Sequence, residues 1–256
     1  MNINNIITNI KINITKKHII FLVLFAALVF ISSRINFSPL VGANNQFFTL
    51  FQFFGPIAGA FLGPIFGAVS VLCSEIADYF IVGKAFTLIN VIRLTPMLFA
   101  AYYFGRKYNV TSKIVAIVVP LIAITAFVMH PVGRTVWFFS LYWTIPIIIA
   151  LMPEKYSHHF SLKSLGATFT AHSVGGAAWI WAIPMTAEQW IALIPVVAFE
   201  RTLFALGIAS SYLVMNTVLD KAMDKLKDKF KWNVPADVLH INKAYVITKK
   251  MFKMHA

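Results

Sequence analysis

Charged residues are scarce in this sequence, and acidic residues are the scarcest of them. Asp, Glu, Lys and Arg make up 12% of the 256 residues, whereas 59% are hydrophobic and the mean hydropathy is +0.76. Soluble domains average about 25% charged and about 45–50% apolar residues. One soluble core of this length cannot bury so many apolar side chains, so the composition excludes a soluble globular domain and a disordered chain. The single cysteine, Cys73, excludes an internal disulfide scaffold.

The sequence also lacks the motifs of common enzymes. It contains no H-E-x-x-H, no G-x-x-x-x-G-K-[ST], no G-x-S-x-G and no G-x-G-x-x-G. The pair His158-His159 has no cysteine or histidine companion at the spacing of a metal site. We therefore predict no enzymatic activity, no metal and no cofactor, and we expect that this chain does not drive ATP-dependent transport by itself.

Basic residues outnumber acidic ones by 22 to nine, which gives a formal net charge of +13. No basic patch with interleaved aromatic residues indicates nucleic-acid binding. Instead, many lysines gather before the first apolar run and after residue 218. They are Lys11, Lys16, Lys17, Lys221, Lys225, Lys227, Lys229, Lys231, Lys243, Lys249, Lys250 and Lys253. This placement is typical of the orientation signal of a membrane protein, and we predict no nucleic-acid partner.

Apolar runs recur along the chain, and a membrane-spanning helix needs about 20 mostly apolar residues. We predict an all-α, polytopic membrane bundle of about eight spans, with six as the alternative count. The expected spans are His18–Phe37, Val41–Phe54, Pro56–Val82, Phe86–Phe104, Ile114–His130, Val136–Met152, Ser164–Ala182 and Gln189–Val218. The second is short and polar and is the weakest, so a re-entrant segment is an alternative there. A proline after Gly55 breaks the chain, and we expect a kink at Gly63-Pro64.

Loop charges favour both termini in the cytoplasm. With eight spans, the cytoplasmic segments 1–17, 105–113, 153–163 and the tail hold most of the lysines and arginines. The domain organisation is then a cytoplasmic segment 1–17, a bundle 18–218 and a basic tail 219–256. In the tail, apolar residues recur at helical spacing from Leu219 to Phe230. This amphipathic helix either lies on the anionic inner leaflet or is a solvated helix that fixes the topology.

Four glycines form a ladder at four-residue intervals: Gly55, Gly59, Gly63 and Gly67. Residues four apart lie near one face of a helix. Small residues on such a face allow close contact between membrane helices. We therefore predict that this ladder packs helices together.

Charged residues follow the ladder at membrane depth. Glu75 and Asp78 lie three residues apart and share a helix face, and Arg93 in the next span, with Asn90 before it, is the expected partner. A charge inside the bilayer costs about 2.5–3.5 kcal/mol and indicates a functional site. The alternatives are ligand binding, a structural clamp between carboxylates and Arg93, and a proton or ion relay.

A second polar cluster falls in the last two spans. His172 lies in the seventh span, Trp179 and Trp181 follow it, and Glu200 and Arg201 lie in the eighth. Because adjacent helical residues diverge by about 100°, we expect Glu200 and Arg201 to have different partners. His172 either bridges two helices or contacts a ligand, and the tryptophans either form an interfacial belt or wall a pocket.

Residues 47–107 resemble the substrate-binding S components of energy-coupling factor (ECF) vitamin transporters. The resemblance rests on the segments FGPIAGAFLG (54–63), EIADY (75–79) and FGR (104–106). It implies a compact helical bundle that holds a small ligand near its outer face. It also implies a coupling transmembrane subunit and ABC-type ATPases as partners.

We accordingly hypothesise a multi-pass protein of the plasma membrane that binds and takes up a vitamin-sized solute. The expected ligand-binding residues are Asn45, Glu75, Asp78, Asn90, Arg93, His172, Trp179, Trp181 and Glu200. Two alternatives use the same bundle: a membrane scaffold or assembly protein, and an ion-coupled secondary carrier.

Overall fold

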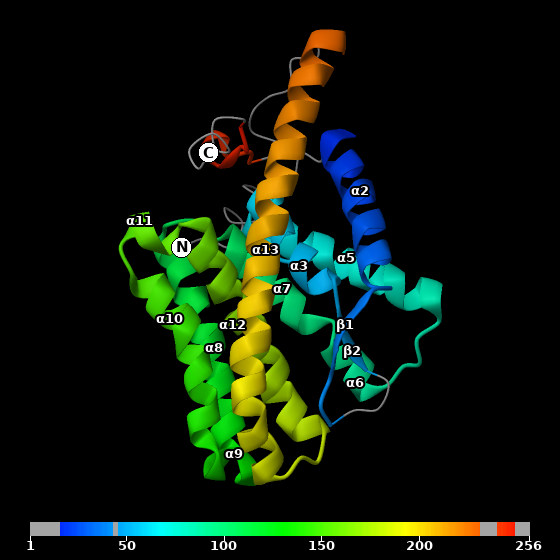
Figure 1. Ribbon diagram of the computed structural model, residues 1–256. Coiled ribbons are helices and arrows are strands. Elements are labelled where there is room, and N and C mark those ends of the chain that lie inside the picture. Colours follow the sequence, from blue (N-terminus) through cyan, green and yellow to red (C-terminus); the bar gives the residue numbers. More distant parts are fainter. Residues whose placement is uncertain (1–15, 43–45, 231–239, 249–256) are drawn as a thin grey trace, which may run out of the picture.

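A computed structural model describes residues 16–42, 46–230 and 240–248, and 78% of the structure is helical. Its long axis is marked by the helix α13 (Ala187–Phe230), which runs along the bundle and projects beyond it (Figure 1). The helix α9 (Pro131–Thr135) lies at one end, here called the α9 end. The projecting part of α13 and the short helix α11 (Glu154–Ser157) lie towards the opposite end, here called the tail end.

The remaining helices fill the space between these ends. They are α2 (Lys16–Ser32), α3 (Phe51–Phe54), α4 (Ile57–Leu62), α5 (Pro64–Val82), α6 (Leu88–Ile92), α7 (Thr95–Gly105), α8 (Val110–Met129), α10 (Thr144–Leu151) and α12 (Phe160–Ala182). Two 3-10 helices, η1 (Trp137–Trp143) and η2 (Lys243–Tyr245), and two strands, β1 (Asn36–Pro39) and β2 (Phe47–Thr49), complete the described elements.

Four helical segments of the described chain are long and apolar enough to cross a membrane. They are Pro64–Val82, Leu88–Gly105, Val110–Met129 and Ala187–Lys225. Two shorter apolar segments, Phe51–Leu62 and Trp137–Leu151, accompany them. The protein is therefore a membrane protein built as a helical bundle, as its composition predicts.

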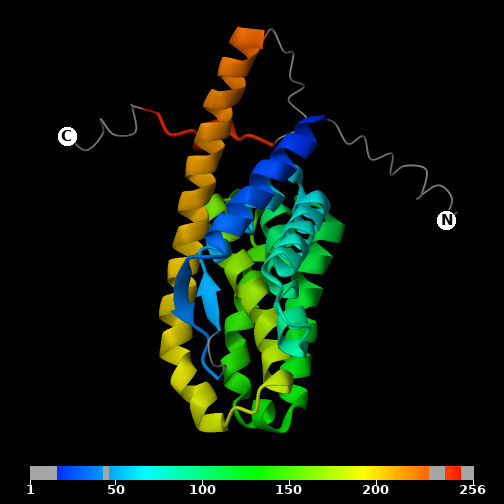
Figure 2. The ribbon, with the colours of Figure 1, turned by 90° about the vertical axis from the view of Figure 1, so that its right-hand side faces the viewer.

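The predicted second span, Val41–Phe54, is wrong. The chain leaves α2 at Ser32, earlier than the predicted end at Phe37, and forms an antiparallel hairpin of β1 and β2. Gly42 has a φ of +89°, and the segment around it is rich in asparagine, a residue that favours turns over helices. Only the four residues of α3 are helical here. Figure 2 shows the hairpin beside α13, in the half of the bundle away from the tail end.

The predicted kink at Gly63-Pro64 is in fact a reversal of the chain. Gly63 has a φ of +81°, which separates α4 from α5 and which residues other than glycine rarely adopt. A Cβ atom added to Gly67 would lie 2.5 Å from the nitrogen of Gly59, so α5 folds back against α4. Gly63 is thus a turn residue instead of a rung in a helix contact.

Gly59 also touches a third helix. A Cβ atom on Gly59 would lie 2.9 Å from the nitrogen of Gly105, and it would collide with the carbonyl of Ala101, both in α7. Gly55 has looser surroundings, with Phe51 and Met97 at 3.1 and 3.3 Å from an added Cβ. The glycines therefore do not form one straight helix face. Instead, Gly59 and Gly67 allow α4, α5 and α7 to meet closely at one junction.

The predicted boundary at residues 218 and 219 is not a break in secondary structure. The helix α13 continues through it to Phe230, and the remaining tail is described only at 240–248. This segment, here called the strap, returns to the bundle. Asn242 and Asn216 exchange two hydrogen bonds of 2.9 Å, and the amide of Ile247 donates to Thr217 Oγ1 at 2.9 Å.

The glycine junction generates a first prediction. Gly59→Ala forces α4 and α7 apart, and overpacking of this kind costs about 1–3 kcal/mol, or about 3–10 °C in melting temperature. Gly175→Ala is the matched control, because its Cβ would meet Pro96 Cγ at 3.5 Å, an ordinary contact. Thermal unfolding of both variants in detergent measures the difference. Equal melting temperatures would contradict the close contact.

Candidate ligand-binding site

A cavity of about 540 Å³ lies between the hairpin, the end of α5, α6, η1, α12 and α13. It is lined by the later half of α12, from Ala171 to Trp179, and by α13 from Trp190 to Arg201. Since α12 ends and α13 begins near α9, the cavity occupies the half of the bundle towards the α9 end (Figure 1). Most of the polar residues singled out in the sequence meet in it.

Asp78 anchors one side of this cavity. Its carboxylate is 4% exposed and accepts from Arg34 Nη2 at 2.8 Å and from Lys84 Nζ at 2.8 Å. The predicted clamp between Asp78 and Arg93 is therefore wrong. The two cations come from just after α2 and from the loop after α5, and no spacing along the chain links either of them to Asp78.

Glu75 lies one turn before Asp78 and lines the same cavity. Its Oε2 atom is buried and has no hydrogen-bond partner among the described residues. Arg93 does not form an ion pair with it, contrary to prediction. A buried carboxylate oxygen without a donor is costly, so Glu75 is a strong candidate for contact with a ligand.

Arg93 instead holds the hairpin in place. Its Nη2 donates to the carbonyl of Phe47 at 2.7 Å, and its Nη1 donates to the side chain of Gln46. Because Arg93 lies between α6 and α7, this contact attaches the hairpin to the wall of the cavity that these helices form. Gln46 was absent from the predicted site, since its role depends on the hairpin.

Two asparagines were predicted in the site. Asn90 lines the cavity and donates through Nδ2 to the carbonyl of Ala85 at 2.9 Å, while its amide is capped by Thr87 Oγ1 at 3.3 Å. Asn90 thereby fixes the loop that enters α6. Asn45 lies outside the described residues.

Glu200 and Arg201 form the opposite side of the cavity. They pair with each other, with Arg201 Nη2 donating to Glu200 Oε2 at 2.7 Å, so the expectation of different partners is wrong. Glu200 also accepts from Ser38 Oγ on β1. The guanidinium carbon of Arg201 lies 4.3 Å from the ring centre of Phe48 on β2. The hairpin is therefore bound to α13 by both residues.

One N–H group of Arg201 makes no hydrogen bond in the described structure. The residue is 4% exposed, and the group is its Nε–H. The ring of Phe204 covers its other side at 4.6 Å. A buried guanidinium N–H that lines the cavity is available to a ligand acceptor.

Aromatic side chains complete the wall. His172 accepts through Nδ1 from Trp143 Nε1 at 3.1 Å, so a neutral imidazole carries its proton on Nε2. Phe139 packs edge-on against Trp190 with ring centres 4.8 Å apart. The Nε1 atom of Trp190 is buried without a partner, and Trp179 also lines the cavity. Trp190 and Phe139 were not among the predicted site residues, because only the packing of α13 and η1 against α12 brings their rings to the cavity.

Trp181 does not belong to this wall, contrary to the prediction. It is 59% exposed, its Nε1 donates to the carbonyl of Ala126 at 3.0 Å, and its ring packs against His130 at 4.9 Å. It lies two positions after Trp179, which turns it by about 200° around α12. Its exposed position suits the interfacial belt that the sequence offered as the alternative.

The cavity therefore combines both charge signs with buried groups that lack partners. Three of the four unpartnered buried side-chain atoms in the described residues line it, namely Glu75 Oε2, Trp190 Nε1 and Arg201 Nε. Each such atom costs about 1–3 kcal/mol unless a partner is supplied. The described residues contain no group of three or more His, Cys, Asp or Glu that could hold a metal ion.

Comparisons with known proteins give one informative match. An uncharacterized protein of Methanocaldococcus jannaschii is 24% identical over 188 residues, covering 68% of this chain. The chain matches 62% of that relative's length. No protein-family model matches the chain, and no solved structure matches it.

The ion pairs of Asp78 generate a second prediction. Arg34→Gln or Lys84→Gln alone leaves Asp78 one cationic partner, so each is expected to lower stability only slightly. The double variant leaves a buried carboxylate uncompensated, which costs about 3–5 kcal/mol, more than the two single effects together. Adding Asp78→Asn should restore most of the loss. Thermal unfolding in detergent measures all four variants, and additive single effects would contradict this account.

Proposed function

We propose that this protein is a multi-pass protein of the plasma membrane that binds and takes up a small, vitamin-sized solute, in the manner of an S component. The observation that carries the proposal is the gathering of three unpartnered buried polar atoms in one cavity of about 540 Å³. Packing alone provides no reason to keep such atoms unpaired, whereas a bound solute supplies their partners.

The positions of these atoms indicate the chemistry of the solute. Glu75 Oε2 requires a donor, whereas Trp190 Nε1 and Arg201 Nε require acceptors. The aromatic rings of Phe139, Trp179 and Trp190 offer flat apolar surface between the two polar sides. A compact molecule with a flat ring, a hydrogen-bond donor at one end and an acceptor at the other fits this arrangement.

The proposed topology has eight crossings with both termini in the cytoplasm. In it, Phe51–Leu62 and Trp137–Leu151 act as short crossings alongside the four longer segments and the helices α2 and α12. The tail end then faces the cytoplasm, which agrees with the Lys and Arg residues of segments 105–113 and 153–163. The cavity at the α9 end would open towards the outside.

Uptake against a gradient requires a source of energy. The sequence holds no phosphate-binding loop for ATP, so a coupling transmembrane subunit with ABC-type ATPases is the proposed partner. The resemblance of residues 47–107 to S components supports this assignment. The relative from Methanocaldococcus jannaschii is uncharacterized and adds no activity.

Ligand retention tests the proposal directly. The full-length protein, purified in mild detergent after incubation with a metabolite extract of its host, is expected to retain one small molecule by native mass spectrometry. Glu75→Gln replaces an acceptor by an amide and should lower retention about tenfold or more, the loss of one charged hydrogen bond. The control Glu154→Gln changes a carboxylate on α11, outside the cavity, and should retain the molecule fully.

Two outcomes would count against solute uptake. Repeated purification without a retained molecule, together with unchanged accumulation of solutes in a deletion strain, would contradict it. Loss of a partner protein on substitution of Glu75, with solute accumulation unaffected, would favour the scaffold alternative instead.

Cysteine labelling tests the proposed topology. In a Cys73→Ser background, a cysteine at Lys155 should react with a membrane-impermeant maleimide only after the cells are opened. A cysteine at Pro184, in the connection between α12 and α13, should react in intact cells. In the eight-crossing topology, α12 crosses the membrane between these two positions. Labelling of both positions from the same side would therefore contradict this topology.

A further inference from the structure

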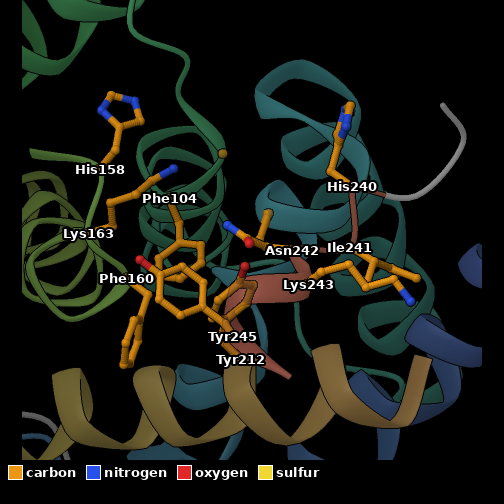
Figure 3. Close-up of a pocket in the computed structure, with 12 residues that line it drawn as sticks. Phe104, His158, Phe160, Lys163, Tyr212, His240, Ile241, Asn242, Lys243 and Tyr245 are labelled. Carbon is orange, nitrogen blue, oxygen red and sulfur yellow. The ribbon is translucent and has the colours of Figure 1, made fainter. Parts of the chain in front are cut away.

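A second cavity, of about 480 Å³, lies at the tail end of the bundle. Its walls are the end of α7, the start of α12, the middle of α13 and the strap, and it shares no lining residue with the first cavity. Figure 3 shows Lys163 directed into the space between α12 and the strap, with the ring of Phe104 beside it. The function proposed above does not use this cavity.

The strap is an ordered wall of this cavity. Besides the paired hydrogen bonds between Asn242 and Asn216, the amide of His240 donates to the carbonyl of Phe61 at 3.0 Å. The ring of Tyr245 packs against Phe160 with centres 4.9 Å apart. Lys243 pairs with Asp220, so its own charge is balanced.

Basic side chains gather on the opposite side of the cavity: Lys163 and His158 line it, and the buried Arg106 lies next to them. Lys163 Nζ donates to the carbonyl of Arg106 at 3.3 Å, and Nε2 of His158 lies 3.2 Å from the same oxygen. Arg106 is 3% exposed, donates to the carbonyl of Ser157 at 2.7 Å and keeps its Nε unpartnered. Within the described ranges, no Asp or Glu oxygen lies within 4.0 Å of these three side chains.

Burial, reinforced by neighbouring positive charge, shifts the protonation of the cluster. Burial, and then the charge of Arg106, lower the pKa of Lys163 to about 7. Burial, followed by the charges of Lys163 and Arg106, lowers the pKa of His158 to about 4. Both shifts report a site in which a further positive charge is unfavourable and in which an anion would be stabilised.

Aromatic rings form the rest of the lining. Phe104, Phe160, Tyr212 and Tyr245 lie together, with Lys163 Nζ 5.7 Å from the ring centre of Phe104. Such a wall suits the apolar or ring portion of a molecule whose anionic group meets Lys163. The lysine has spare N–H donors, because its single described partner is one carbonyl oxygen.

We infer that this cavity binds the phosphate group of an organic phosphate, with the phosphate on Lys163 and the remainder against the aromatic wall. Phosphate suits the site because a lysine ammonium is a common point-charge ligand for it. The ligand is either a soluble phosphate compound of the cytoplasm or the headgroup of an inner-leaflet phospholipid.

Titration of the full-length protein in neutral detergent with inorganic phosphate tests the site. The wild-type melting temperature should rise with phosphate, and Lys163→Met should weaken the apparent Kd about tenfold or more, because the charged donor is lost. Lys155→Met is the control, since this lysine lies on α11 outside the cavity, and it should bind as the wild type does. Equal binding by wild type and Lys163→Met would overturn the assignment.

Titration with sulfate at several pH values tests the protonation of Lys163 alone, because sulfate stays a dianion between pH 6 and pH 9. Any change in affinity over this range then comes from the protein. Sulfate affinity should be nearly constant below about pH 7 and should fall above it, as Lys163 loses its proton. Lys163→Arg keeps its charge and should bind sulfate with similar affinity at pH 6 and at pH 9. Persistence of the pH dependence in Lys163→Arg would assign it to another group facing the cavity, such as His240, Lys243, Tyr212 or Tyr245, and would contradict the role of Lys163.

Lipid nanodiscs distinguish the two sources of phosphate. Retention of phosphatidic acid over phosphatidylcholine by wild type and Lys155→Met, but not by Lys163→Met, would identify the phospholipid headgroup. Binding of inorganic phosphate and sulfate without such a lipid preference would identify a soluble phosphate compound. Failure of the wild-type protein to bind phosphate, sulfate and phosphatidic acid would overturn the inference, whatever happens to the solute in the first cavity.

Discussion

Charged side chains inside an apolar bundle persist only where other polar groups meet them, and the architecture of this protein follows from that constraint. Asp78 is 4% exposed and is held by Arg34 and Lys84. Glu200 and Arg201 neutralise each other beside the hairpin. Arg93 donates to the backbone carbonyl of Phe47 and to the side chain of Gln46. Through these contacts, the chain just before the hairpin is attached to α5, and the hairpin itself is attached to Arg93 after α6 and to α13, around one cavity.

The hairpin is costly in an apolar environment unless its backbone groups are paired. Its own ladder pairs some of them, and Arg93 and Ser38 add contacts to α6 and α13. The non-helical hairpin therefore lies beside the polar cavity, where its backbone and side chains find hydrogen-bond partners. Non-helical backbone at membrane depth is tolerated where it lines a protein-enclosed polar space. In this bundle, the same feature supplies the candidate ligand site.

The two cavities differ in charge and in surroundings. The first contains cations and carboxylates together, with unpartnered atoms of both donor and acceptor type. The second is lined by Lys163, which lies next to the buried Arg106 with no described carboxylate within 4.0 Å, and by an aromatic wall that the strap completes. The tight junction of Gly59, Gly67 and Gly105 lies among the helices near the second cavity, whose lining includes Gly105. Backbone contact at this junction leaves little room for relative movement of α4, α5 and α7.

Composition and apolar runs predicted the membrane class and the helical bundle, and they singled out a few charged residues within the apolar segments. These follow from composition and from the cost of charge in lipid, which need no knowledge of contacts. The sequence also placed Glu75, Asp78, Arg93, His172, Trp179 and Glu200 among the lining of one site, as the cavity shows. Contacts between distant segments set the partners, which are Arg34 and Lys84 for Asp78 and the hairpin for Arg93, and they leave Trp181 facing outward. Partner choice depends on where chain reversals at Gly42 and Gly63 bring distant segments together, and periodicity along a single chain carries no information about that.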